Sequence, residues 1–289
     1  MRSALRNLLS CLTLLACGLA TLPLAAQEGP LDTAPPANVT PEEIIKHFAA
    51  NETEFAQARE QYTFRQDVKV QTLDGDTPDG EYHEVFDVIF DEKGKRTENV
   101  VFAPQSTLSK ISMTQEDMED IRHRLPFVLT AAELPEYNVL YVGQQQEDDL
   151  HCYAFDIAPK KIEGKKRYFQ GRVWVDDKDF QIVKTYGKTV PDIRKKHGND
   201  ENLFPKFTTW RQQVDGKYWF PVYTKADDEL HFKLQDVHIK EIVKYEDYKR
   251  FGSKVKILYN GQEVEKADPK DQKQPQNTPD ATPSTPPQK

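Results

Sequence analysis

The chain has 289 residues, of which 30% are charged and 37% are hydrophobic, and its mean hydropathy is −0.74. This composition excludes a bundle of membrane helices and a fibrous repeat, and it indicates one globular domain with attached segments. The formal net charge is −8, from 39 basic and 47 acidic residues. An acidic chain argues against nucleic acid as the partner, because phosphates require a basic surface.

The first 26 residues have the pattern of a secretory signal peptide. Arg2 and Arg6 precede a largely apolar run over residues 8–24, and polar residues follow Ala26. We therefore predict cleavage after Ala26 and export to the periplasm. Two alternatives stay open: the run could anchor the chain in a membrane, or the chain could be a lipoprotein that is acylated at Cys17.

Only Cys152 lies outside this leader, so the exported chain cannot form an internal disulfide in spite of its oxidising destination. Cys152 follows His151 in a predicted strand. Adjacent strand residues point to opposite faces, so a catalytic pair of these two residues is not expected. We predict a buried, unreactive thiol.

Two further segments are polar and rich in proline. They cannot bury enough apolar surface to offset the entropy of ordering the chain, which predicts a disordered linker over residues 27–39 and a disordered tail over residues 261–289. The folded domain is therefore predicted to span residues 40–260. The tail could also act as a spacer or as a polyproline ligand.

The domain begins with a helix signal. Thr40 is an N-cap residue, Pro41 takes the first helical position, and Glu43 completes a capping box. An apolar stripe then predicts a helix that continues to about Arg59. The members of this stripe are Ile44, Phe48 and Phe55.

Alternating apolar and polar residues predict the strands that follow. The pattern covers residues 62–71 and returns over residues 82–90 after a turn at residues 74–80, so that each strand has one apolar face. A third strand passes through residues 100–102. Short turns between such strands favour antiparallel hairpins.

A second helix begins at Thr114, where Asp117 completes a capping box, and Pro126 marks its end. A short helical turn is predicted near residues 130–134. Further strands are predicted at residues 138–143, 150–157, 167–176, 179–186, 206–214, 218–226, 229–234, 236–246 and 254–259. The fold class is therefore mainly β (α+β), with a curled antiparallel sheet and no βαβ alternation.

One face of this sheet stays apolar, and two helices are too few to cover it fully. We therefore expect a hydrophobic concavity that is only partly filled, although a filled core would give the same alternation. The residues predicted to face the concavity and to bind a ligand are Tyr62, Phe64, Val68, Val70, Phe86, Val88 and Phe90.

No catalytic or metal-binding motif is present: HExxH, CxxC, GxSxG, GxGxxG and the P-loop do not occur. His231 and His238 form the only near pair among seven scattered histidines, so neither a metal site nor a cofactor is predicted. The acidic stretches 74–80 and 176–179 lack EF-hand spacing and are typical of hairpin turns. The basic run over residues 160–167 is predicted to be a solvated loop, with attraction to anionic lipid as the alternative.

Several segments resemble the outer-membrane lipoprotein-sorting (LolA/LolB-like) superfamily. They are residues 169–176 (FQGRVWVD), 180–184 (FQIVK), 211–221 (RQQVDGKYWFP) and 243–251 (VKYEDYKRF). The resemblance spans about residues 40–252. It implies an N-terminal helix and a strongly curved antiparallel sheet, an unclosed barrel whose apolar concavity is lidded by helices. It also implies a periplasmic carrier that shields acyl chains, and no functional residue is transferred from the superfamily.

We therefore expect a non-enzymatic periplasmic carrier or chaperone that binds an acyl chain of a lipoprotein or a lipid. Its other partners would be membrane-associated donor or acceptor proteins. The alternative is a cell-envelope scaffold or protein-binding module with a filled core, and a cavity too small for a chain would favour it. A hydrolase is a third option, which requires a pair of carboxyl groups with raised pKa values in a cleft.

Overall fold

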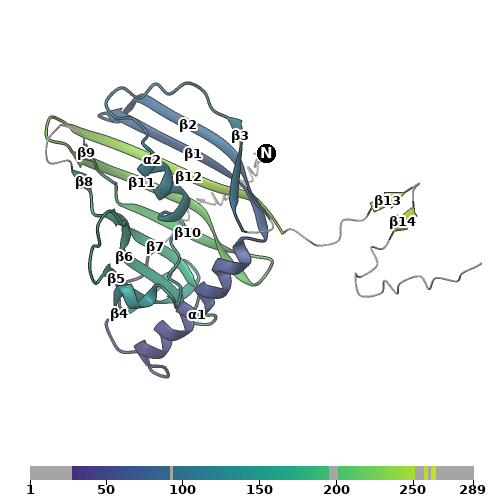
Figure 1. Cartoon of the computed structure of the whole chain (residues 1–289). Helices are drawn as coiled ribbons and strands as arrows, with labels where there is room; N and C mark the ends of the chain where they lie inside the picture. The colour runs from purple at the N-terminus through teal and green to yellow at the C-terminus, as the bar shows by residue number, and fades with distance from the viewer. Residues whose placement is uncertain (1–27, 92–93, 195–200, 251–256, 260–261, 265–289) are drawn as a thin grey trace, which may run out of the picture. The chain divides into compact units, whose positions relative to one another are not determined.

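In the computed structural model, residues 28–91, 94–194, 201–250, 257–259 and 262–264 are described (Figure 1). The chain divides into two compact units, residues 1–249 and 250–289. Within the second unit, β13 (Ile257–Tyr259) and β14 (Gln262–Val264) form an antiparallel hairpin. The predicted signal peptide lies outside the described residues, as does the predicted tail from residue 265 onward.

The first unit is built on one ten-stranded antiparallel sheet with the order β3-β2-β1-β12-β11-β10-β7-β6-β5-β4. The sheet is open, because β3 and β4 form its two edges, and this confirms the predicted mainly β class. Two short strands, β8 (Ile193–Arg194) and β9 (Glu201–Asn202), form a separate two-stranded sheet and lie between β7 and β10 in the sequence. The strands of the large sheet are β1 (Tyr62–Asp74), β2 (Thr77–Phe90), β3 (Arg96–Phe102), β4 (Tyr137–Glu147), β5 (Leu150–Pro159), β6 (Tyr168–Asp176), β7 (Ile182–Val190), β10 (Phe207–Val214), β11 (Tyr218–His231) and β12 (Asp236–Arg250).

The strand β11 corrects one boundary, because two strands were predicted at residues 218–226 and 229–234. The alternation continues without a break through Asp227 and Asp228, and Leu230 returns to the buried face. Asp227 points to solvent on the outer face, so the pair Asp227–Asp228 does not interrupt the strand.

The two helices begin where their capping boxes predict. In α1 (Pro41–Arg59), the Glu43 amide donates to Thr40 Oγ1 at 3.2 Å, and the Thr40 amide donates to the Glu43 carboxylate at 2.9 Å. In α2 (Gln115–His123), Thr114 and Asp117 make the same exchange at 3.2 and 2.8 Å. A 3-10 turn, η1 (Leu134–Glu136), follows. No helix in the described part of the chain is long and apolar enough to cross a membrane.

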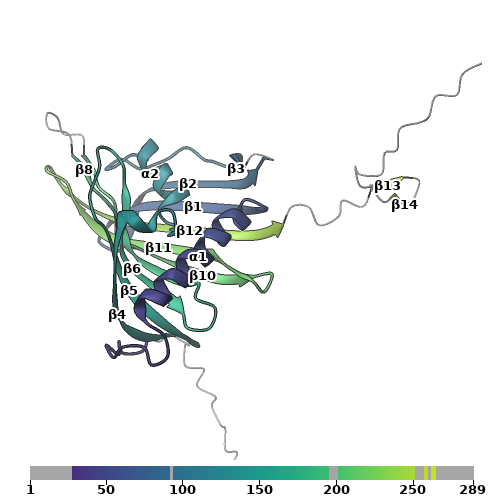
Figure 2. The same cartoon turned by 60° about the horizontal axis from the view of Figure 1, so that its bottom comes forward.

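Both helices pack on the concave side of the bent sheet, and α1 runs across the strands (Figure 2). Ile44 and Phe48 of α1 and Ile121 of α2 join the same buried cluster as Val68 and Val88. The loop after α2 adds to this cluster, since the rings of Phe127 and Phe169 stack with centroids 4.3 Å apart. Helices and aromatic side chains thus fill most of the concave face.

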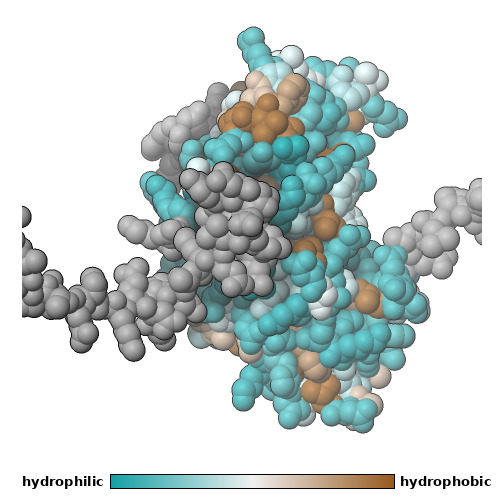
Figure 3. Space-filling model, turned by 90° about the vertical axis from the view of Figure 1, so that its right-hand side faces the viewer, coloured by the Kyte–Doolittle hydropathy of each residue, from teal (hydrophilic) through white to brown (hydrophobic). Residues whose placement is uncertain are grey.

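The segment for which the sequence predicts a linker follows the edge strand β4. The Gly29 amide donates to the Gln146 carbonyl, and the Asp32 amide to the Gln144 carbonyl, both at 2.8 Å. Backbone pairing holds this segment, and Leu31 also packs against the buried cluster of Cys152, Ala154, Trp174 and Val183. On the face drawn in Figure 3, most of the coloured surface is hydrophilic, and apolar side chains form separate groups.

Candidate functional site

All seven residues predicted to bind a ligand lie on the two strands β1 and β2. Tyr62, Val68, Val70, Phe86 and Val88 are at most 4% exposed, whereas Phe64 and Phe90 are partly buried. Most of the set therefore packs in the interior. Three of its members line the two cavities of the inner face: Val70 lines one, and Phe64 and Phe90 line the other. Contact between this set and a ligand stays a prediction.

Among the described residues, two cavities lie on the inner face of the sheet, and the charged side chains that line them are mainly of opposite sign. We name the first the basic pocket; it measures about 240 Å³ and contains the arginines Arg59, Arg96 and Arg122. We name the second the acidic pocket; it measures about 300 Å³ and contains the carboxylates of Asp117, Asp120, Glu201 and Glu241.

Aromatic rings form the apolar wall of the basic pocket. Phe220 contacts both Phe55 and Tyr248, with ring centroids 5.1 and 4.6 Å apart, and Phe64 lies 5.1 Å from Tyr248. The Tyr248 hydroxyl donates to the Pro221 carbonyl at 2.7 Å. The polar end of this tyrosine is therefore satisfied elsewhere, and its ring is available as apolar surface.

Two of the three guanidinium groups in the basic pocket are already paired. Arg96 and Arg122 both bind the Glu98 carboxylate, at 2.8 Å each, and Arg96 also donates to Gln66 Oε1 at 2.7 Å. Glu60 supplies the only carboxylate among the described lining residues, since Glu98 lies outside the lining. The lining thus holds three guanidinium groups against one carboxylate, and Glu98 is the shared partner of two of them.

Arg59, in the last turn of α1, is the third guanidinium group. Within the described part of the chain its side chain forms no hydrogen bond and no ion pair. Burial, together with the nearby charge of Arg211, lowers the pKa of Arg59, but an arginine keeps its proton in a protein. This fixed positive charge therefore lines an aromatic cavity without a hydrogen-bond or ion-pair partner among the described residues, although the charges of Glu52 and Glu60 act on it from farther away.

Sequence reasoning did not find these arginines. A basic residue in the last helical turn is ordinary, because it complements the helix dipole, so Arg59 carries no distinctive signal. Gln66 does carry one: it is a polar residue at an inward position of β1, and it is fully buried. A polar side chain in an apolar row indicates a partner across the core, which here is Arg96.

The acidic pocket is organised by α2. Asp117 belongs to the capping box, and Asp120 binds Arg167, whose side chain is 9% exposed. Arg167 ends the basic run that was predicted to be a solvated loop, so this residue corrects the prediction at the end of that run. It is buried because Asp120 and the Glu116 carbonyl accept its guanidinium hydrogens.

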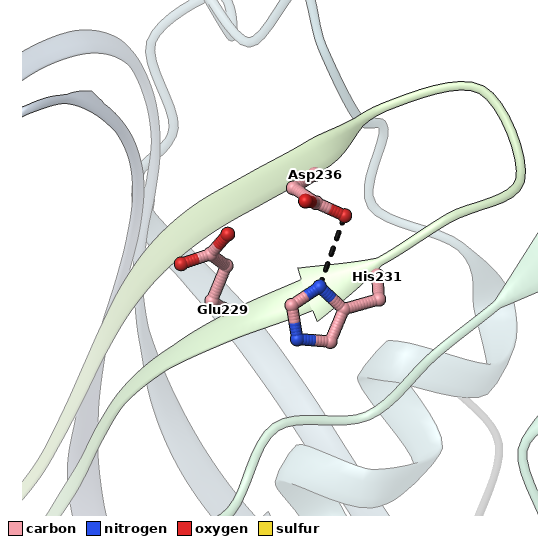
Figure 4. Close-up of side chains that lie close together, drawn as sticks. All are labelled: Glu229, His231 and Asp236. Atoms are coloured by element: carbon pink, nitrogen blue, oxygen red, sulfur yellow. Dashed lines mark hydrogen bonds and ion pairs between the residues drawn. The ribbon is translucent and has the colours of Figure 1, made fainter.

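Candidate metal ligands lie on the outer surface of the β11–β12 hairpin. Glu229, His231 and Asp236 place ligand atoms within 4.8 Å of one another, and all three are exposed (Figure 4). His231 Nδ1 lies 2.9 Å from Asp236, and His238 lies 2.7 Å from Asp227. Cross-strand ion pairs of this kind are common on exposed sheet faces, so this cluster supports no metal assignment.

The acidic stretch 176–179 has a carboxylate engaged within its turn. Asp176 accepts hydrogen bonds from the amides of Lys178 and Asp179, both at 3.1 Å. The turn predicted at residues 74–80 is shorter in the structure, because β1 continues to Asp74 and β2 begins at Thr77. Asp79 therefore lies in a strand, where it binds Lys110 and Thr72, both at 2.6 Å.

The prediction for the cysteine is also met. Cys152 is 2% exposed, whereas the preceding His151 points outward to solvent. Burial raises the pKa of the Cys152 thiol, and neighbouring carboxylates raise it further. Both effects disfavour the thiolate, which is the nucleophilic form.

Comparisons with known proteins give structural likenesses only. No family model matches the chain, and no curated protein matches it. A LolA superfamily protein from Nitrosomonas europaea is similar at 15% identity with a TM-score of 0.31, covering 74% of this chain and 94% of that one. A DUF1329 family protein from Desulfovibrio piger is similar at 11% identity with a TM-score of 0.37, covering 70% and 91%.

A third similar structure is a domain described as an outer membrane lipoprotein-sorting protein, from Vibrio parahaemolyticus. It is 10% identical, with a TM-score of 0.33, and the match covers 73% of this chain and 94% of that one. Two of these three carry the name of the superfamily that the sequence segments resemble. With TM-scores below 0.4, we take no function, partner or site residue from them.

Proposed function

We propose that this chain is a non-enzymatic carrier of the cell envelope that binds an acyl chain of a lipid or lipoprotein, with the basic pocket as the point of attachment. The observation that supports the proposal is the Arg59 guanidinium in an aromatic cavity, which has no hydrogen-bond or ion-pair partner within the part of the chain that the structure describes. The predicted signal peptide, with export to the periplasm and membrane-associated donor or acceptor proteins, belongs to the same proposal.

The chemistry of the basic pocket selects an anionic amphiphile. A guanidinium group matches the geometry of a carboxylate or a phosphate, and the aromatic wall removes methylene groups from water at about 0.8 kcal/mol each. A fatty acid or a phospholipid combines both features. Lipids with an anionic group are therefore the preferred ligand class.

The size of the cavity limits how much of the ligand it holds. A volume of about 240 Å³ is below the range of about 300 to 1,000 Å³ that is typical of small-molecule sites. We propose that the pocket takes the polar group and the adjoining part of the chain. A longer chain would displace α2 and reach Val70, Phe86 and Val88 of the predicted set.

The test begins with the protein purified from a Gram-negative periplasm without detergent. Native mass spectrometry and solvent extraction would identify a bound lipid, and titration with hexadecanoate would measure affinity. We expect Arg59→Met to weaken hexadecanoate binding at least tenfold. The matched control is Arg65→Met, because Arg65 lies on the outer face and pairs with Asp87 at 2.9 Å.

Two results would contradict the carrier proposal. One is a clean apo mass in a protein that also refuses hexadecanoate and phosphatidylglycerol. The other is equal binding by the wild type, Arg59→Met and Arg65→Met proteins, which would remove the basic pocket as the point of attachment.

The second candidate function is a protein-binding module, and the edge strand β3 favours it. Val100, Val101 and Phe102 are 60%, 52% and 48% exposed, and β3 pairs only with β2 among the described strands. An extended segment of a partner can add to such an edge through backbone hydrogen bonds. Recovery of a stoichiometric envelope protein that Val101→Lys abolishes, with no bound lipid, would support this function over the carrier.

A further inference from the structure

The acidic pocket contains a carboxyl group that has no partner among the described residues. Glu241 on β12 is 6% exposed and lines the cavity of about 300 Å³. Among the described residues, nothing donates a hydrogen bond to it and no cation pairs with it. Its strand neighbours on the same face are all buried and apolar or aromatic: Val237, Ile239, Val243 and Tyr245.

The other charged groups of the acidic pocket are engaged. Asp117 accepts hydrogen bonds from Thr114, and Asp120 binds Arg167. The two lysines that line the pocket are paired as well, Lys110 with Asp79 at 2.6 Å and Lys233 with Glu201 at 3.9 Å. No cation of the described chain therefore remains for Glu241.

The electrostatics of the cavity favour a positive ligand. Four carboxyl groups line it, those of Asp117, Asp120, Glu201 and Glu241. Among the described residues, Arg167 pairs with Asp120 and Lys233 with Glu201, so Asp117 and Glu241 have no cation. Burial, together with the charges of Asp117 and Asp120, raises the pKa of Glu241 to about 8. A cation near Glu241 would reverse this effect by stabilising the ionised form.

More than half of the side chains that line the cavity are apolar, which defines the rest of the ligand. The apolar lining includes Val70, Ile121, Leu125, Phe207, Leu230 and Ile239. A small inorganic cation would leave this surface without a contact and would bring its own hydration shell. An organic cation with an alkyl or aryl body would bury the same surface and release water.

We infer that the acidic pocket binds an amphiphilic amine, whose ammonium group pairs with the Glu241 carboxylate and whose apolar body packs against the side chains around Ile121 and Phe207. The site is distinct from the basic pocket, since the two share no lining residue. The inference therefore does not depend on the carrier proposal.

Three probes with the same chain length test this inference on the full chain by isothermal titration calorimetry at pH 7.5. They are octylammonium, octanol and octanoate. We expect octylammonium to bind at least tenfold more tightly than the other two. Octanol measures the apolar contribution alone, and octanoate places a negative charge beside the carboxyl groups of the pocket.

Glu241→Gln is the matched variant, because it keeps the size of the side chain and removes its charge. We expect it to reduce octylammonium affinity at least tenfold and to leave octanol binding unchanged. The control is Glu229→Gln, on the exposed face of the neighbouring strand. A thermal melt of each variant shows whether it is folded, and Arg59→Met should bind octylammonium like the wild type.

The dependence of affinity on pH is a second readout. Because an ammonium group binds ionised Glu241, octylammonium affinity should rise from pH 6 to about pH 8, by up to about tenfold per unit, and then level off. The groups that face Glu241 or line the same pocket are Asp117, Asp120, Arg167, Lys110, Glu201 and Lys233. The Glu241→Gln protein should lose most of this slope.

Two outcomes would overturn the inference. One is octanol binding as tightly as octylammonium, which would mean that no charge is recognised. The other is an octylammonium affinity that does not change in Glu241→Gln, including the case in which only Asp117→Asn lowers it. That result would show that Glu241 does not bind the ammonium group.

Discussion

Glu52 of α1 and Arg211 of β10 form a bidentate ion pair inside the domain, with N–O distances of 2.9 and 3.2 Å. Their side chains are 0% and 1% exposed. Arg211 also donates to the Phe127 carbonyl, and its guanidinium lies 5.1 Å from the Phe55 ring centroid. This pair therefore connects α1 and the loop after α2 to β10 of the sheet.

Removing one partner of this pair should destabilise the protein strongly. We expect Glu52→Leu to lower the free energy of unfolding by about 3 to 5 kcal/mol, because it leaves a buried guanidinium without its carboxylate. The double variant Glu52→Leu/Arg211→Met should recover much of that loss. Denaturant unfolding of the two single variants and the double variant measures the coupling, and purely additive losses would contradict a specific pair.

Glu241 should make stability depend on pH. Its pKa is raised from 4.5 to about 8 by burial, so the folded state binds more protons than the unfolded state between these values. The free energy of unfolding should therefore fall as the pH rises from about 4.5 to 8, by at most about 5 kcal/mol from this group, and then level off. Melting of wild type and Glu241→Gln at pH 5.5 and 8.5 isolates this contribution. Identical pH slopes would show that Glu241 ionises without hindrance.

Fatty-acid binding should require the aromatic wall of the basic pocket. We expect Phe90→Ala to weaken hexadecanoate binding about tenfold, since Phe90 lines the cavity and is only partly buried. Phe102→Ala is the matched control, because Phe102 is 48% exposed on the edge strand. Equal affinities for the two variants in a titration would place the acyl chain elsewhere.

Lys184 should hold the N-terminal segment against the sheet. Its ammonium binds Glu147 at 2.8 Å and also Glu28, and it lies 4.5 Å from the Trp174 ring centroid. We expect Lys184→Met to cost about 2 to 4 kcal/mol, because Glu147 would stay buried without its partner.

Hydrogen exchange provides the local readout for this variant. The amides of Gly29 and Asp32, which donate to β4, should exchange faster in Lys184→Met. The control Lys188→Met removes a pair with Asp192 that is about 30% exposed and should cost less than about 1 kcal/mol. Unchanged exchange at Gly29 and Asp32 would show that backbone pairing alone holds the segment.

The sequence by itself determined the local elements, because their signals lie within a few residues. Both capping boxes, at Thr40 and Thr114, predicted where the helices begin. Alternation over residues 62–71 predicted which side chains are buried, since a strand repeats every two residues. The same alternation could have identified Glu241 and Gln66, two polar residues at inward positions of apolar rows.

Only the tertiary structure decided which of these polar residues has a partner. β1 lies beside β12 although about 160 residues separate them in the chain, and Arg211 meets Glu52 across 159 residues. Whether a buried charge is neutralised depends on groups brought within a few ångströms by packing, which no local pattern encodes. For that reason Glu52 is part of the core, whereas Arg59 and Glu241 are left facing the cavities that we propose as binding sites.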